Sequence, residues 1–394
     1  MLELRGRVLV GPTEERDRAW VVGGRLTFER PSTPGTQMSV IEGWTLPGLV
    51  DAHCHVGLDA HGPVDVATQE RQAETDRDAG ALLLRDAGSP ADTRWIDDRP
   101  DLPQIVRAGK HIARTKRYLR NYADEIEPDE LPAAMALQAR RGDGWVKLVG
   151  DWIDRSVGDL APCWPAEALV AGIAAAHREG ARVTAHCFGE DCLPDLIAAG
   201  IDGIEHATGL TDETRAEAVR RQVAIVPTLM NIDTFPELAD RAAEKFPIYA
   251  AHMRELHARR HQNVRDAHDA GVPVFCGTDA GGSLPHGLVA SEVAQLRAAG
   301  LSNRAALDAA CWGARRWLGR PGLVEGASAD LVVYPADPRE DVAVLATPTA
   351  IVLRGKAFRE SPDGFAAASS SESSGGPLGS SSSESLGTLS SGQP

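Results

Sequence analysis

The sequence predicts an α/β fold: a (β/α)8 barrel, or TIM barrel, with a small β-sandwich domain built from both termini. Three observations predict it. Short apolar runs alternate with helical stretches in the middle of the chain, similar short strands occur at both ends, and polar residues recur where the apolar runs finish. The 394 residues are enough for one barrel and one small domain.

The apolar runs have the length and composition of buried parallel strands. In order, they are 45–53, 80–88, 103–109, 144–150, 181–187, 202–207, 223–229 and 272–280. The clearest helices between them are expected over 165–180, 211–222 and 252–271, because their ends carry Pro, Thr-Asp or Gly boundary signals. Strands and helices that alternate in this way predict a closed barrel, whose active face lies at the carboxyl ends of the strands.

The two ends of the folded part look alike. Residues 1–46 and 321–359 hold short alternating strands separated by Gly and Pro turns, and neither end makes a convincing sheet alone. Together they are expected to form the composite β-sandwich, with the barrel domain at 47–320. Residues 360–394 are rich in Ser, Gly and Glu and are predicted to be a disordered tail, with a docking or phosphorylated tail as the alternative.

Composition excludes several classes of protein. A formal net charge of −15 argues against binding to a nucleic-acid backbone, which needs a basic face. No window approaches the roughly 18 apolar residues of a membrane span, and the first residues lack the apolar run of a signal peptide. We therefore expect a cytoplasmic protein with a small-molecule substrate. The six cysteines form no C-x-x-C pair, which argues against a disulfide framework or a thiolate zinc site.

Polar side chains stand at the ends of several apolar runs. In LPGLVDAHCHVG, His53 and His55 are two residues apart, so they share one face of a strand. Later runs end in His186, His206 and Asp279. Each has a simpler explanation, as a hydrogen-bonded core histidine or, for the aspartate, as a helix cap.

Lys147 is harder to explain in that way, because it lies inside the apolar run WVKLV. A buried ammonium group is unfavourable unless it is paired or loses its charge. Reaction with CO2 is one solution, since it converts the amine into an anion that can bridge two cations. Four histidines, one lysine and one aspartate at strand ends favour a metal site over six unrelated core residues.

These motifs resemble those of the amidohydrolase superfamily, and within it the imidazolonepropionase-like and metallo-dipeptidase (Xaa-Pro dipeptidase-like) group. The matching pieces, over about residues 1–358, are LPGLVDAHCHVG, RDAG, WVKLVG, VTAHCFG, GIDGIEHATG and FCGTDAGG. The resemblance implies two divalent metal ions, with zinc expected and manganese, cobalt or iron as alternatives. The implied ligands are His53, His55 and Asp279 for one ion, His186 and His206 for the other, and carboxylated Lys147 as the bridge.

The function implied by the resemblance is hydrolysis of an amide C–N bond in a small substrate, such as a dipeptide or an N-acyl amino acid. A metal-bridging hydroxide would attack, with Asp279 as general base and then acid. The alternatives are a mononuclear deaminase or cyclic-amide (imidazolonepropionase-type) hydrolase, and hydrolysis of carbamates, lactones or organophosphate esters at the same site. A non-catalytic assembly subunit is disfavoured, because no ligand is missing.

Substrate contacts are predicted at His286, in SLPHGL, and more weakly at Asn231, after PTLM. A surface-packed loop histidine is the alternative for His286. Relatives usually carry a Gly-Gly-His segment where this chain has KHIARTKRYLRNY, residues 110–122. Its basic residues are expected on a solvated helix face, with binding of an anionic substrate as the alternative. Barrels of this kind often pair, so a homo-oligomer is also among the expected assemblies.

Overall fold

The computed structural model describes residues 1–32 and 38–360. Almost all of the predicted tail, 360–394, therefore lies outside the described residues. No helix in the described ranges combines the length and apolarity that crossing a bilayer requires. The six cysteine thiols are all buried and free.

The central part of the chain is an α/β structure with two parallel sheets. The larger sheet has the order β11-β10-β12-β15-β16-β17, and the smaller one has the order β5-β8-β9. In the larger sheet the bounds are β10 His111–Arg114, β11 Ala123–Ile126, β12 Trp145–Val149, β15 Arg182–Cys187, β16 Gly203–His206 and β17 Ala224–Val226. In the smaller sheet they are β5 Leu49–Cys54, β8 Ala81–Asp86 and β9 Gln104–Arg107.

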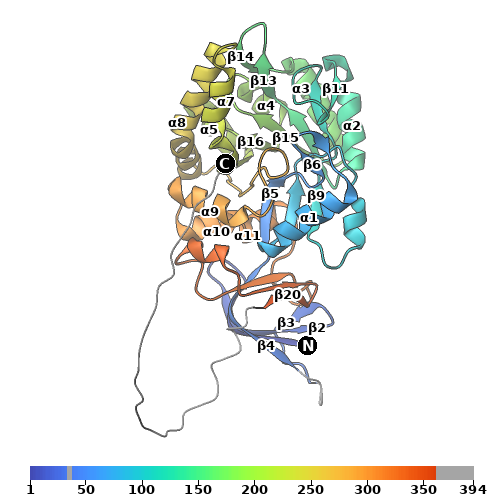
Figure 1. Cartoon of the computed structure of the whole chain (residues 1–394), viewed down its shortest axis with the longest axis vertical. Helices are drawn as coiled ribbons and strands as arrows, with labels where there is room; N and C mark the ends of the chain where they lie inside the picture. Colours follow the sequence, from blue (N-terminus) through green and yellow to red (C-terminus); the bar gives the residue numbers. More distant parts are fainter. Residues whose placement is uncertain (33–37, 361–394) are drawn as a thin grey trace, which may run out of the picture. The chain divides into compact units, whose positions relative to one another are not determined.

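Helices follow the strands and cover them. Figure 1 shows α2 and α3 on one side of β15 and β16, and α5 and α8 on the other. The longer helices are α1 Val66–Asp78, α2 Leu131–Arg141, α3 Ala166–Arg178, α5 Asp212–Arg221, α8 Pro247–Ala270 and α9 Val289–Ala298. The shorter ones are α4 Leu193–Ala199, α6 Leu229–Ile232, α7 Phe235–Ala242, α10 Asn303–Ala309 and α11 Trp312–Trp317. The helices predicted over 165–180, 211–222 and 252–271 are confirmed as α3, α5 and α8.

The strands do not close into the predicted barrel. Segment 272–280, predicted as the last strand, makes only isolated bridges, from Val274 to Ile225 of β17 and from Ala280 to Cys54 of β5. Pro273 lacks the N–H group that a regular ladder needs. Gly277 lies so close to β5 that a Cβ atom there would come within 2.6 Å of the His53 Cβ. The segment therefore lies between β17 and β5 without forming a continuous ladder.

Segment 110–122 is not the basic helix that was predicted. It begins as strand β10, and the turn after it includes Lys116 and Asn121 at positive φ. Arg117 is not solvated either, since its guanidinium binds Asp154 at 2.7 Å and the carbonyl oxygens of Trp152 and Ala161. These contacts hold the segment against the hairpin of β13 (Asp151–Asp154) and β14 (Asp159–Pro162).

The two ends of the chain meet in one mixed sheet of seven strands, ordered β20-β19-β18-β4-β1-β2-β3. Their bounds are β1 Leu2–Leu9, β2 Glu15–Val22, β3 Arg25–Thr27, β4 Ser39–Pro47, β18 Leu331–Tyr334, β19 Ala350–Leu353 and β20 Lys356–Glu360. Figure 1 shows the blue first strands beside the red last ones. The expectation of a β structure shared by both termini is thus confirmed as one sheet, and the described strands do not form the two facing sheets of a sandwich. The domain boundaries at 46/47 and 320/321 stay a prediction.

Candidate active site

Several predicted metal ligands meet at the carboxyl ends of the strands. His53 lies near the end of β5 and His206 ends β16, while Asp279 lies in the segment between β17 and β5. One ligand atom from each of these three residues lies within 4.8 Å of the others. His55 joins them, with its Nε2 3.2 Å from Nε2 of His53.

Asp279 is central to this cluster. Its Oδ1 lies 3.0 Å from Nε2 of His53 and 3.0 Å from Nε2 of His55. Burial opposes ionisation, but the imidazoles of His53, His55 and His206 hold the pKa of Asp279 well below its usual range. Its side chain is 18% exposed, against 1% and 6% for His53 and His55. The carboxylate is therefore the part of this trio most open to an approaching molecule.

His186 and Lys147 lie on the other side of the cluster. The ring of His186 is centred 4.7 Å from that of His206, and its buried Nε2 has no hydrogen-bond partner among the described residues. Lys147 is 1% exposed, and its ammonium makes no hydrogen bond or ion pair within the described part of the chain. Burial lowers the pKa of Lys147 below its ordinary value. Both groups are buried polar atoms that lack a partner, which a bound ligand would supply.

The second ring nitrogens of three histidines have partners outside the cluster. Nδ1 of His55 donates to the carbonyl oxygen of Gly88 at 2.6 Å, and Nδ1 of His206 is hydrogen-bonded to the hydroxyl of Thr228 at 2.7 Å. Nδ1 of His53 donates to the carboxylate of Glu205 at 2.7 Å. With Nδ1 protonated and engaged, each ring presents an unprotonated Nε2 to the cluster, which is the form that binds a metal.

The backbone at this site is strained. His206 has a φ of 66°, Asp279 one of 58° and Thr228 one of 45°, although none of them is glycine. A positive φ is costly for a residue with a Cβ atom and is most costly for a β-branched one such as Thr228. Such strain is found where the surrounding structure holds a side chain in a required position. Here the strained residues are two members of the cluster, His206 and Asp279, and Thr228, whose hydroxyl is hydrogen-bonded to His206.

These residues fit a divalent metal ion. The donor set is imidazole nitrogen and carboxylate oxygen, which suits zinc and related ions. The close approach of His53 and His55 to a shared carboxylate oxygen places several such donors within reach of one ion.

The predicted substrate residues lie in different surroundings. His286 packs against α1, where its Nδ1 binds Asp76 at 2.8 Å, and its side chain is 4% exposed. Asn231 lies in α6, three residues after Thr228, and its side chain makes no hydrogen bond within the described ranges. Their roles in substrate binding stay predictions.

His111 was not predicted for the site. It is fully buried, and neither ring nitrogen has a partner in the described part of the chain. Its ring is centred 5.2 Å from that of His55 and 5.4 Å from that of Tyr118. A sequence signal existed, because Gly109 and His111 keep the first glycine and the histidine of the Gly-Gly-His expected in this segment.

Aromatic rings surround His186 and were also missed. Tyr118, Trp152 and Phe188 have ring centroids 5.7, 5.3 and 4.3 Å from that of His186. They come from the loop after β10, from β13 and from the residue after β15. Tyr118 and Trp152 are far from His186 in the sequence, whereas Phe188 stands two residues after it, so the period of two along a strand could have found that ring.

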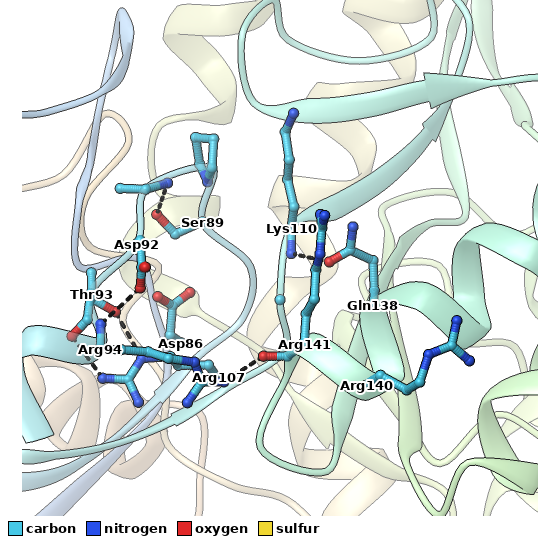
Figure 2. Close-up of a pocket in the computed structure, with 13 residues that line it drawn as sticks. Asp86, Ser89, Asp92, Thr93, Arg94, Arg107, Lys110, Gln138, Arg140 and Arg141 are labelled. Carbon is cyan, nitrogen blue, oxygen red and sulfur yellow. Dashed lines mark hydrogen bonds between the residues drawn. The ribbon is translucent and has the colours of Figure 1, made fainter.

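A cavity of about 570 Å³, lined by Asp86 at the end of β8, contains none of the predicted ligands. Arg94, Arg107 and Lys110 line it, and Figure 2 shows Arg107 beside Thr93. Most of the cations are already paired: Arg107 binds Asp97 and Asp143, Arg94 binds Asp143, and Lys110 binds Asp124 outside the cavity. The cavity therefore resembles a structural ion-pair network, and the chemistry is better placed at the histidines.

Comparison with known proteins identifies the family to which this chain is similar. The model of the amidohydrolase family matches residues 149–357. An uncharacterized protein of Mycobacterium tuberculosis is 57% identical over 358 residues, 91% of this chain and 95% of that protein. The ochratoxinase of Aspergillus niger is 27% identical over 248 residues, 60% of this chain and 50% of that protein. Among solved structures, an Xaa-Pro dipeptidase superposes with a TM-score of 0.77 at 22% identity, covering 91% of this chain and 99% of its own.

Proposed function

This chain belongs to the amidohydrolase family, and from that premise we propose that it is a binuclear metal-dependent hydrolase that cleaves an amide C–N bond of a small substrate. One observation carries the proposal: atoms of His53, His206 and Asp279 that can bind a metal lie within 4.8 Å of one another at the carboxyl ends of the strands. The proposed ligands are those named from the sequence: His53, His55, Lys147, His186, His206 and Asp279.

The proposal of a second ion depends on Lys147 and His186. Burial favours the neutral amine of Lys147, and the neutral amine is the form that attacks CO2. A new N–C bond then forms and a proton leaves, so that the product carries a negative charge. An anion between two cations accounts for a buried lysine without a carboxylate partner. His186 has a buried nitrogen that awaits a partner.

Divalent ions bound there would polarise a substrate carbonyl and lower the pKa of a water molecule from about 15.7 toward about 7. The residues of the chain supply the proton transfers. Asp279 is ionised and is the most open member of the trio it forms with His53 and His55, so it is placed to take the proton of the attacking water. The same carboxyl group would then return the proton to the leaving nitrogen.

Two observations bear on the substrate. The aromatic side chains of Tyr118, Trp152 and Phe188 beside His186 favour an apolar group next to the scissile bond. His111 offers a neutral imidazole with both nitrogens free, since burial holds its pKa well below the ordinary value. The name of the Xaa-Pro dipeptidase makes dipeptides the first compounds to test, and N-acyl amino acids follow.

The test is a hydrolysis screen of the metal-loaded protein together with its metal content. We expect about two divalent ions per chain and turnover of at least one dipeptide, N-acyl amino acid, carbamate or lactone. Asp279→Asn should lower kcat by at least about 100-fold while one ion remains bound. One ion per chain, with deamination or ring opening of a cyclic amide, would instead support a mononuclear enzyme. A chain that binds no metal and is indifferent to chelators would refute both.

A further inference from the structure

The buried carboxylate of Glu205 connects the metal cluster to the interior of the strands. Its Oε2 accepts the hydrogen bond from Nδ1 of His53 at 2.7 Å. Its Oε1 accepts from the guanidinium of Arg85 at 2.5 Å and from the hydroxyl of Thr184. None of these four residues is more than 1% exposed, so no exposed side chain or bulk solvent competes for the bonds.

The donor and acceptor roles in this chain of contacts are fixed from the arginine end. A guanidinium can only donate, so the atom facing Arg85 has to be an acceptor. The other oxygen of the ionised carboxylate also accepts a hydrogen bond. Nδ1 of His53 therefore has to carry the proton that it donates to Glu205. In the neutral ring, Nε2 of His53 is then left unprotonated and faces Asp279.

Arg85 is itself held on several sides. Its Nε donates to the carbonyl oxygen of Ala52 at 2.6 Å, the residue before His53 in β5. The guanidinium carbon lies 4.7 Å from the ring centre of Trp145 and 4.9 Å from that of Trp317, which are in contact with each other. These cation–π contacts fix the plane of the guanidinium without supplying another acceptor.

We propose that Glu205 and Arg85 are positioning residues that set the tautomer of His53 and through it the metal affinity of the cluster. The metal-affinity part of this inference rests on the proposed function, whereas the tautomer part does not. Arg85 acts at a distance: it touches no cluster residue except through Glu205 and the backbone of β5.

Glu205→Gln tests the proposal because the two side chains have the same shape. In this variant the amide oxygen has to face Arg85, so the amide N–H group faces Nδ1 of His53. The ring should then carry its proton on Nε2, toward the cluster. We expect ¹⁵N NMR of the metal-free protein in alkaline buffer to report Nδ1–H for His53 in the wild type and Nε2–H in E205Q. Zinc affinity, measured by competition with a chelator, should fall by about 10- to 100-fold or more.

Three further variants make the result specific. Glu205→Asp keeps the charge and should retain the Nδ1–H tautomer. Arg85→Lys loses the planar fork and should weaken zinc binding less than E205Q does. Arg315→Lys is the matched control, because Arg315 is another buried arginine that binds backbone carbonyls, of Gly48 and Pro321, away from Glu205. It should leave zinc affinity unchanged, and circular dichroism should confirm that each variant is folded.

The outcomes separate the two proposals. If E205Q keeps the Nδ1–H tautomer, or binds zinc as the wild type does, the inference is overturned while the hydrolase proposal stands. If the wild-type protein binds no zinc, the hydrolase proposal fails, and the NMR comparison still decides the tautomer. A zinc affinity that falls equally in R315K would also overturn the inference, since it would mean that any buried arginine matters as much.

Discussion

The histidines of β5 and those of β15 and β16 face the same cluster but are held in different ways. In β5, His53 donates to a buried carboxylate and His55 to a backbone carbonyl oxygen. On the other side, Nδ1 of His206 is hydrogen-bonded to the hydroxyl of Thr228, and Nε2 of His186 has no hydrogen-bond partner in the described part of the chain and lies 3.9 Å from the Asp151 carboxylate. The β5 pair is therefore held by stronger acceptors than the pair from β15 and β16.

The same difference appears in the electrostatics. Burial opposes the charged form of His53, but Glu205 and Asp279 raise its pKa above the ordinary value. Burial lowers the pKa of His206 to about 3 and holds that of His186 well below the ordinary value. The contrast is therefore between His53, whose charged form two buried carboxylates favour, and the histidines of β15 and β16, which burial keeps neutral. Burial also lowers the pKa of His55, the second histidine of β5. Substitutions on each side of the cluster test this difference.

The largest effect is expected from Lys147→Met, which removes the group between the two sides. Methionine has nearly the length of lysine but cannot react with CO2. Activity should therefore fall by more than about 100-fold, which exceeds the usual effect of losing a residue that only hydrogen-bonds a metal ligand. The metal-free protein should become more stable, by about 1–3 kcal/mol, because an unpartnered buried amine is replaced by an apolar group. Metal analysis, turnover and urea denaturation of the metal-free protein check both parts. A variant that is both inactive and less stable would contradict the view that the lysine is present for function.

The second prediction compares His53→Ala with His186→Ala in the metal-free protein. His53→Ala leaves Glu205 without one partner and also removes a contact of Asp279, so it should cost about 1–3 kcal/mol more in unfolding free energy than His186→Ala. Both changes delete the same imidazole from a buried position, which makes each the control of the other. Equal losses would mean that the β5 side is not held more firmly.

Part of this contrast could be predicted from the sequence. The alternation of apolar runs and helices predicted the parallel α/β part, and the strand-end pattern pointed to His53, His206 and Asp279, which the structure brings together. The period of two along a strand placed His53 and His55 on one face. It also correctly placed Glu205 and His206 on opposite faces of their strand. It could not show that the Glu205 side chain reaches His53, which lies in the other parallel sheet.

The parts that were missed depend on contacts between distant segments. The barrel stays open because no ladder joins β9 to the larger sheet among the described strands, and segment 272–280 makes only isolated bridges to β17 and β5. An apolar run reports neither feature. The helix predicted at 110–122 was wrong because Arg117 is bound by the hairpin of β13 and β14. Two ring partners of His186, Tyr118 and Trp152, come from segments that meet it only in the folded chain.

The smallest effect is expected from Thr228→Val, on the side held by a hydroxyl. Valine is also β-branched and nearly the same size, so the strained backbone and the packing should change little, while His206 loses the acceptor for Nδ1. A neutral hydroxyl holds an imidazole less firmly than a carboxylate does. The loss in zinc affinity should therefore be near the lower end of the usual range, about 10-fold.

Measuring zinc affinity of Thr228→Val and Glu205→Gln side by side sharpens the comparison, because each variant removes the acceptor of one cluster histidine. Thr184→Val is a useful control, since Thr184 donates to Glu205 without touching a ring nitrogen. If Thr228→Val weakened binding more than Glu205→Gln, the hydroxyl and not the carboxylate would be the stronger support. Zinc binding would then depend more on His206 and its hydroxyl partner than on His53 and its carboxylate partner.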